Sequence, residues 1–171
     1  MDPISRVETE RLVATPMTDR DLVFLYRLWQ DPRVAMSLGG LRSRARLEPL
    51  FHRMIGDWDR LGFGSWVVRL RPDGPRIGRV GLHPTSAGGR ESVELGYALL
   101  PEYWGQGHAT EISRAAIRFG FDGVGLAEVV AFTMTTNAAS RRVLEKAGLT
   151  YEREFMHAGW PHAYYRVVAP V

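Results

Sequence analysis

Cysteine is absent from all 171 residues of the sequence. This absence excludes disulfides, thiolate zinc sites and cysteine nucleophiles together. Long apolar runs are also missing, because charged residues interrupt every one well before the roughly 18–20 residues that a membrane-spanning helix needs. No secretory-type apolar segment stands near the first residue. We therefore expect a cytoplasmic protein with no membrane partner.

Lysine is nearly absent, with Lys146 as its only occurrence, so the net charge of +3 is carried almost entirely by arginine. Arg42, Arg44 and Arg46 form the densest cluster, and a second group lies between residues 69 and 79. Such clusters raise the hypothesis of an arginine-rich module that binds RNA or the ribosome. Because 19 acidic residues are interspersed, a compositional preference for arginine is favoured over a nucleic-acid partner.

Composition otherwise indicates an ordinary globular protein, with 45% apolar and 24% charged residues. The length fits one domain over residues 1–171 that can bury a sizeable core. The five histidines lack metal-ligand spacing, so we expect no metal site. A serine-hydrolase motif Gly-x-Ser-x-Gly is also missing.

Alternation of helical and strand periodicity predicts an α/β fold. Turn and cap signals separate the elements, among them Thr18 with Asp21, the Asp31-Pro32 stop and Gly62. The expected order is a strand at 9–17, helices beginning near 18 and 43, strands at 63–70 and 76–82, a central strand from 92, a helix from 109, a strand at 126–135, a helix from 137, and a hairpin at 149–157 and 163–168.

The segment from 94 to 110 is predicted to run from a strand through a glycine loop into a helix. Apolar and other residues alternate up to Leu99, and Pro101 ends the strand because it has no N–H for a ladder. Gly105 and Gly107 allow a tight turn and close approach of a ligand to the backbone. A helix that begins there presents free N–H groups and a positive dipole, which favours binding of a phosphate or pyrophosphate.

Two common phosphate loops do not match this segment. A P-loop needs Gly-Lys-Ser or Gly-Lys-Thr, which this sequence lacks. The dinucleotide fingerprint needs a third glycine where Thr110 stands. Glu128 does lie at a suitable distance downstream for a ribose contact, which leaves the dinucleotide hypothesis weakened but open.

Trp104-Gly105-Gln106-Gly107-His108-Ala109 resembles the pyrophosphate loop of the GNAT acetyltransferase superfamily, with Trp104 in place of the usual leading Gln or Arg. The Trp-Gly-x-Gly-x-Ala-Thr-Glu form resembles the Rim-type branch, which includes ribosomal-protein N-terminal acetyltransferases. The segment from Asn137 to Leu149 is similar to a second family element. The resemblance covers nearly the whole chain, and it implies a GNAT fold with a mixed sheet of about six to seven strands and about four helices.

The resemblance implies acetyl-CoA as the acetyl donor. Backbone N–H groups near Leu99 and Leu100 would hold the acetyl oxygen and the pantetheine arm, and Asn137 and Ser140 would lie near the arm and the sulfur. The pyrophosphate would lie on the loop formed by Trp104, Gly105, Gln106, Gly107, His108, Ala109 and Thr110.

Glu94 is the candidate general base, since a half-buried carboxyl has a raised pKa. The alternative is a surface carboxylate paired with an arginine. Ser140 is the candidate to support the leaving thiolate, because Leu144 stands where many relatives have a tyrosine. Ser140 is equally explained as a residue that satisfies a helix N-terminus, and Asn137 as a helix cap.

These patterns predict an acetyl-CoA-dependent N-acetyltransferase, and the lack of cysteine favours direct attack by the amine in a ternary complex. The acceptor is a protein N-terminus or a small-molecule amine, and a homodimer is compatible with the family. Few acidic residues in the first two helices disfavour a polycationic acceptor. The alternatives are a non-catalytic acyl-CoA-binding regulator and the RNA- or ribosome-binding module. Aromatic or polar residues expected in segments along the acceptor cleft, or in the core, are Phe63, Trp66, Trp160 and His162.

Overall fold

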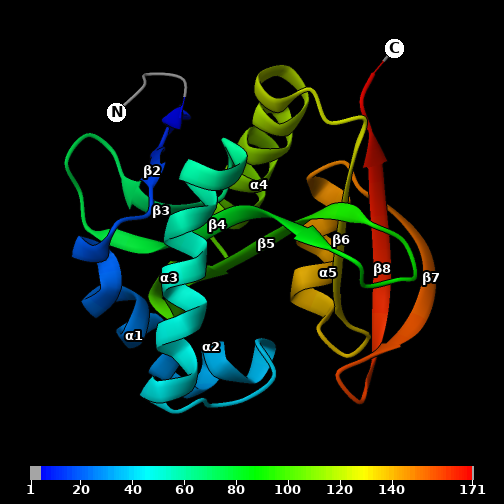
Figure 1. Ribbon diagram of the computed structural model, residues 1–171, viewed down its shortest axis with the longest axis horizontal. Coiled ribbons are helices and arrows are strands. Elements are labelled where there is room, and N and C mark those ends of the chain that lie inside the picture. The colour runs from blue at the N-terminus through cyan, green and yellow to red at the C-terminus, as the bar shows by residue number, and fades with distance from the viewer. Residues whose placement is uncertain (1–4, 171) are drawn as a thin grey trace.

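The computed structural model describes residues 5–170, which form one mixed sheet of eight strands (Figure 1). The strand order is β1-β2-β3-β4-β5-β6-β8-β7, and every neighbouring pair is antiparallel except β5 with β6. The strands are β1 (Val7–Glu8), β2 (Leu12–Pro16), β3 (Ser65–Leu70), β4 (Arg76–Thr85), β5 (Ser92–Leu99), β6 (Glu128–Met134), β7 (Thr150–His157) and β8 (Trp160–Val168). The α/β prediction is confirmed, but the sheet has more strands than the six to seven expected.

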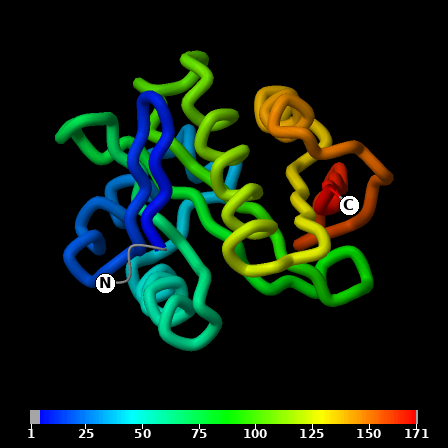
Figure 2. The backbone as a smooth tube through the Cα atoms, turned by 90° about the horizontal axis from the view of Figure 1, so that it is seen from above, coloured from blue at the N-terminus to red at the C-terminus, as the bar shows by residue number. Residues whose placement is uncertain are grey.

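Five α-helices flank the sheet in the described chain, one more than expected. They are α1 (Leu22–Gln30), α2 (Pro32–Ser37), α3 (Arg44–Leu61), α4 (His108–Arg118) and α5 (Ala138–Lys146). Figure 2 shows α3 on one side of the sheet and α4 and α5 on the other. The sequence prediction missed α2 because it treated Pro32 only as a stop. Proline also suits a first helical turn, and the Asp31 carboxylate accepts the Arg33 N–H at 2.9 Å there.

Several predicted boundaries are confirmed by their local chemistry. The Asp21 carboxylate accepts the Thr18 N–H at 3.0 Å where the first helical segment begins. Gly62 ends α3 in the left-handed conformation, with φ 75°. The first strand is shorter than predicted, beginning at Leu12, because the residues before it turn back to pair β1 with β2.

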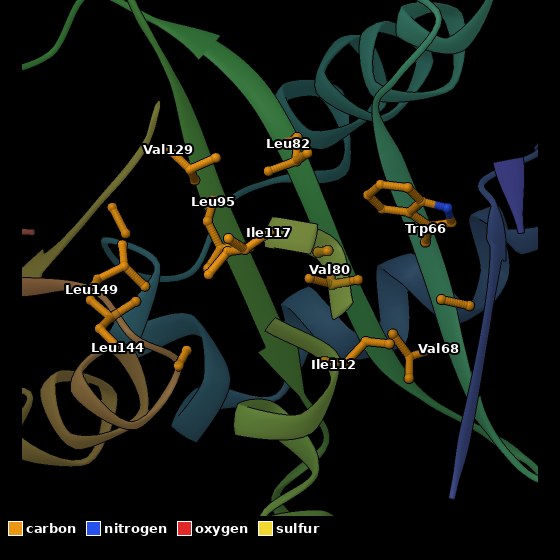
Figure 3. Packing of buried hydrophobic residues seen from close by; sticks show 14 of the residues in the cluster. Trp66, Val68, Val80, Leu82, Leu95, Ile112, Ile117, Val129, Leu144 and Leu149 are labelled. Carbon is orange, nitrogen blue, oxygen red and sulfur yellow. The ribbon is translucent and has the colours of Figure 1, made fainter. Parts of the chain in front are cut away.

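Two apolar layers hold the sheet between the helices. On one face, Ile112 and Ile117 of α4 pack against Val80, Leu82 and Leu95 of the central strands (Figure 3). The opposite face is covered by α1, α2 and α3, and its largest fully buried side chains include Leu25, Leu28, Leu47 and Phe51. Each such side chain stabilises the fold by about 1.5–3 kcal/mol through burial.

The sheet opens between β5 and β6. These parallel strands pair only at Glu94 with Val130, so the remaining residues of β5 have no partner on β6. Polar groups of a strand need partners when they are buried, and an opening of this kind leaves them available to a ligand. No helix within residues 5–170 is long and apolar enough to cross a membrane.

Candidate active site

A cleft of about 840 Å³ occupies the opening between β5 and β6. Its walls come from both strands, the glycine loop, the first turn of α4, and α5. Residues of α2 and the following loop line one side, and the β7–β8 turn lines the other. The cleft therefore joins the predicted pyrophosphate loop to the predicted base.

The glycine loop has the geometry that an anion requires. Gly105 and Gly107 are both left-handed, with φ 74° and 81°, and a Cβ added at Gly105 would meet nothing within 4 Å. Gly107 precedes α4, so the N–H groups of His108, Ala109 and Thr110 have no partner within the helix. These donors, the helix dipole and open space above the loop fit a pyrophosphate.

Side chains from outside the loop fix its position. The Trp104 Nε1 donates to the Leu99 carbonyl at 2.8 Å, which ties the loop to the end of β5. The Arg11 Nη1 donates to the Gln106 carbonyl at 2.9 Å. Gln106 is the one predicted loop residue that does not line the cleft, and its side chain donates to the Glu102 carbonyl. Trp104 is therefore a loop anchor as well as part of the cleft wall.

The two predicted backbone donors at the end of β5 differ. The Leu100 N–H donates to the Ile77 carbonyl at 2.8 Å, so it is occupied by the sheet. Successive N–H groups of a strand point to opposite edges. The Leu99 N–H consequently points away from β4, toward the opening, and Leu99 lines the cleft while Leu100 does not.

The buried side chain of His108, and not only its backbone N–H, belongs to the wall of the cleft. Its side chain is only 5% exposed, and its Nδ1 is buried without a hydrogen-bond partner among the described residues. Burial, followed by the charge of Arg11, lowers the pKa of the imidazole. The ring is therefore predominantly neutral at pH 7.

Asn137 and Ser140 lie together where α5 begins. The Asn137 Oδ1 accepts the Ser140 N–H at 3.1 Å, so Asn137 is the helix cap. The Ser140 Oγ lies 2.8 Å from the hydroxyl of Tyr97, which reaches across from β5. Burial raises the pKa of Tyr97 to about 12, so this phenol stays protonated. Tyr97 is not among the site residues predicted from the sequence, because its position in the strand alternation is that of a core residue.

Leu144 belongs to the apolar core and not to the cleft chemistry. Its side chain is 1% exposed and packs in the layer with Ile112 and Leu149. The position of the usual tyrosine therefore supplies no proton here. The Tyr97–Ser140 pair places two hydroxyl groups in the cleft wall formed by β5 and α5.

Glu94 lies at the point where β5 and β6 separate, and it lines the cleft. Its side chain is half-buried. Burial raises the pKa of the carboxyl to about 7, while the positive charge of Arg79 opposes this rise. No arginine of the described residues lies within ion-pair distance of Glu94. This argues against the alternative interpretation, in which Glu94 is a surface carboxylate paired with an arginine.

A buried polar network on β4 faces Glu94. Arg79 and His83 share one face of the sheet with Glu94, and the Arg79 Nη1 lies 3.3 Å from the His83 Nε2. The other His83 nitrogen faces the Asp57 carboxylate at 3.9 Å. Burial, followed by the charge of Arg79, lowers the pKa of His83 to about 3, so the ring is neutral. The sequence signal was present but unused: Arg79 and His83 stand in the interior of β4, flanked by apolar residues and glycines, at positions of the same parity.

The remaining predicted residues separate into core and cleft. Phe63 and Trp66 are buried, with Trp66 fully enclosed, whereas Trp160 and His162 line the cleft. Glu128 forms ion pairs with Arg90 and Arg166 and does not line the cleft, which argues against the dinucleotide hypothesis. No group of three potential ligands for a metal occurs between residues 5 and 170.

A splayed mixed sheet, a glycine loop at a helix N-terminus and a carboxyl in the opening define an acyl-CoA-dependent transferase site. Residues 11–150 match the family model described as "Acetyltransferase (GNAT) domain". The chain belongs to this family, and it is an acetyltransferase that uses acetyl-CoA. The family match does not select the Rim-type branch over other branches.

Individual relatives agree with the family. The chain is 31% identical to the FsC-acetyl coenzyme A-N(2)-transacetylase of Aspergillus fumigatus, over 88% of this chain and 67% of that protein. An acetyltransferase structure from Agrobacterium tumefaciens superposes with a TM-score of 0.85 at 24% identity, covering 99% and 97% of the two chains. The spermidine N-acetyltransferase of Vibrio cholerae, solved with CoA and spermine, has a TM-score of 0.75 at 19% identity, covering 94% and 96%. At these identities the two structures show the fold alone.

Proposed function

We propose that the protein transfers the acetyl group of acetyl-CoA to a primary amine by direct attack within a ternary complex. The observation that carries this proposal is a carboxyl with a pKa of about 7, Glu94, in the same cleft as the glycine loop. Bound acetyl-CoA supplies the activated thioester. The new N–C bond forms as the C–S bond breaks, and the electron pair of that bond goes to sulfur.

Glu94 accepts the proton that the attacking amine releases, directly or through one water molecule. A pKa near 7 leaves about half of the carboxyl ionised at neutral pH, which suits a group that gains and loses a proton in each cycle. The Leu99 N–H, which points into the opening, stabilises the acetyl oxygen as it gains negative charge.

Ser140 supports the sulfur as it leaves. Its hydroxyl is held by the Tyr97 hydroxyl at 2.8 Å, and the hydroxyl proton of Tyr97 stabilises negative charge through Ser140. The pyrophosphate binds the loop from Gly105 to Thr110. Arg142 and Lys146 of α5 also line the cleft, and their positive charge favours binding of the phosphates there.

The acceptor is a protein N-terminus or a small molecule with a primary amine. The Trp-Gly-x-Gly-x-Ala form of the loop supports a Rim-type enzyme that acts on a protein N-terminus. Nothing in the cleft favours the two non-enzymatic alternatives. A regulator would bind acetyl-CoA and release no CoA with any amine, and an RNA-binding module would lose affinity steeply with salt.

The test is CoA release from acetyl-CoA with a panel of amines, measured from pH 5.5 to 9 for the wild type and Glu94→Gln. In the wild type, kcat/KM should rise with pH through about 7, because the base acts in its ionised form. Glu94→Gln should lower kcat by about 10²–10⁴-fold, the usual contribution of a general base.

Glu91→Gln is the matched control, since Glu91 is exposed and lies just before the same strand. It should leave the pH profile unchanged. An undiminished kcat in Glu94→Gln, at saturating amine and with acetyl-CoA binding intact, would remove Glu94 from this role.

A further inference from the structure

Arg79 is a buried cation without a counter-ion. Its side chain is 7% exposed, and no carboxylate of the described residues lies within ion-pair distance of it. The other buried charged residues are compensated: Asp21 pairs with Arg76 and Asp57 with Arg60. A buried charge is normally paired, because removing it from water is costly. The charge of Arg79 is therefore available to an anion from outside the chain.

The guanidinium is held in position but not saturated. Trp29 lies against it at 5.0 Å from the ring centroid, and neutral His83 accepts from Nη1 at 3.3 Å. The Nε is buried without a partner. A Cβ on Gly96 would lie 3.3 Å from Nη1, so the group lies over this glycine of β5. Arg79 lines the cleft, so its remaining donors can reach a ligand there.

Glu94 and Arg79 lie next to each other on one face of the sheet. Gly96 is two residues beyond Glu94, which corresponds to about 6.6 Å along a strand. The two side chains thus present opposite charges a short distance apart, outside ion-pair contact with each other. A small molecule with an amine and a carboxylate a few bonds apart presents the complementary arrangement.

The other charged residues that line the cleft also favour an anionic group on the ligand. Arg42 is exposed and lines the cleft; among the described residues it makes no ion pair, and its side chain donates to the Leu38 carbonyl at 2.9 Å. Glu94 is the only carboxylate among the described cleft-lining residues. Such a cleft attracts an anionic group and disfavours a polycation.

We propose that the acceptor is an amino acid or a close analogue, whose carboxylate binds Arg79 while its amine faces Glu94. This inference rests on the proposed function and names its substrate class. A peptide N-terminus would place a neutral amide where the carboxylate is expected, which would leave Arg79 unpaired. The aromatic side chains of Phe132 and Trp160 on the opposite wall favour an apolar or aromatic side chain on the acceptor.

The experiment compares acids with their amides as acceptors: L-phenylalanine, L-methionine and β-alanine, each beside its primary amide. Spermidine and an alanine-rich peptide with a free N-terminus complete the panel. Wild-type kcat/KM, corrected for the fraction of free amine, should be about 10- to 100-fold higher for the acid in at least one pair, the range expected for a charge-assisted bond. Arg79→Gln should remove this preference by raising KM for the acid alone.

The acid-to-amide ratio in Arg79→Gln is divided by the ratio in the wild type, so differences in acceptor basicity cancel. Arg118→Gln, an exposed position on α4 outside the cleft, should keep the wild-type ratio. Arg42 is exposed, so Arg42→Gln should leave the fold intact. This variant should raise KM for the acid about 2- to 5-fold.

The outcomes separate the two proposals. Equal efficiency for every acid and its amide, or turnover of spermidine or the peptide alone, would overturn the amino-acid assignment and leave the proposed function standing. CoA release with no member of the panel, despite acetyl-CoA binding, would contradict the proposed function itself. If Arg79→Gln does not fold, the wild-type preference and the Arg42→Gln effect still decide the assignment.

Discussion

At the scale of single residues, the hydrogen bond between Tyr97 and Ser140 can be tested by replacing each hydroxyl in turn. If Ser140 stabilises the leaving sulfur, Ser140→Ala should lower kcat by about 10-fold or more with little change in the KM for acetyl-CoA. Tyr97→Phe should lower kcat about 3- to 10-fold, the effect of losing one oriented hydrogen bond. Single-turnover rates at saturating amine measure both effects.

Tyr151→Phe is the control for Tyr97→Phe, because Tyr151 is exposed on β7 and does not line the cleft. It should behave as the wild type. If Ser140→Ala keeps the wild-type kcat, Ser140 is only part of the helix N-terminus. If Tyr97→Phe alone is impaired, the phenol acts without Ser140.

Residues such as Glu94 could be singled out from the sequence because strand alternation gives their face and their chemistry is evident. The position of Arg79 inside an apolar strand is visible in the sequence, but its role is not, because that role depends on Gly96 of the neighbouring strand and on Trp29 of α1. The register that brings these residues together is a tertiary property. Leu100 shows the converse, since only the pairing with Ile77 reveals that its N–H is occupied.

At the scale of elements, the glycine loop predicts separable effects on stability and binding. Gly107→Ala forces a Cβ into a left-handed conformation with φ 81°, at a cost of about 1–2 kcal/mol, and brings it within 3.3 Å of Arg11. Because Gly107 precedes the N–H groups that face the pyrophosphate, the Kd for acetyl-CoA should rise about 10-fold or more. Calorimetric titration measures this change.

Gly125→Ala is the matched control for the loop. Gly125 has nearly the same conformation, φ 78°, and open space around its Cβ direction, but it lies outside the cleft. Both variants should lose similar stability in urea, and only Gly107→Ala should lose affinity. Equal Kd values for the two variants would mean that the loop does not bind the cofactor.

Local signals predicted most elements, and their failures have local reasons. Gly62 and Asn137 end or cap their helices as expected. The short helix α2 was missed because the same Asp31-Pro32 pair that stops α1 also begins α2. Sequence periodicity cannot distinguish the end of one helix from the end of a helix that is followed immediately by a second helix.

For the whole molecule, the two sides of the cleft come from different parts of the sheet. The antiparallel strands β1 to β5 form one part, β6 to β8 form the other, and a single parallel pair joins them (Figure 1). Apolar burial on both faces stabilises each part, while the opening between them exposes polar groups. The family fold could be predicted from motif order, whereas the charges within the opening required the register of the strands.

The pH dependence of unfolding tests these charges at the scale of the whole molecule. The pKa of Glu94 rises from 4.5 unfolded to about 7 folded, so its contribution to stability is complete below pH 4.5 and is lost as pH rises through 7. The pKa of His83 falls from 6.5 to about 3, so its contribution is present above pH 6.5 and is lost as pH falls toward 3. For these two groups together, stability should be greatest between about pH 4.5 and 6.5, where the fall of one contribution with pH is offset by the rise of the other.

Glu94→Gln removes only the loss on the alkaline side, because glutamine stays neutral. The quantity to compare is the free energy of unfolding in urea of Glu94→Gln minus that of the wild type. This difference should be more positive at pH 8.5 than at pH 4.5, by on the order of 1–3 kcal/mol. Glu91→Gln, which changes an exposed carboxylate, should show no such difference between the two pH values. A Glu94→Gln effect of the same size at both pH values would mean that Glu94 is as well solvated in the folded protein as in the unfolded chain. The carboxyl would then have an ordinary pKa, and the rise of kcat/KM through pH 7 would need another group.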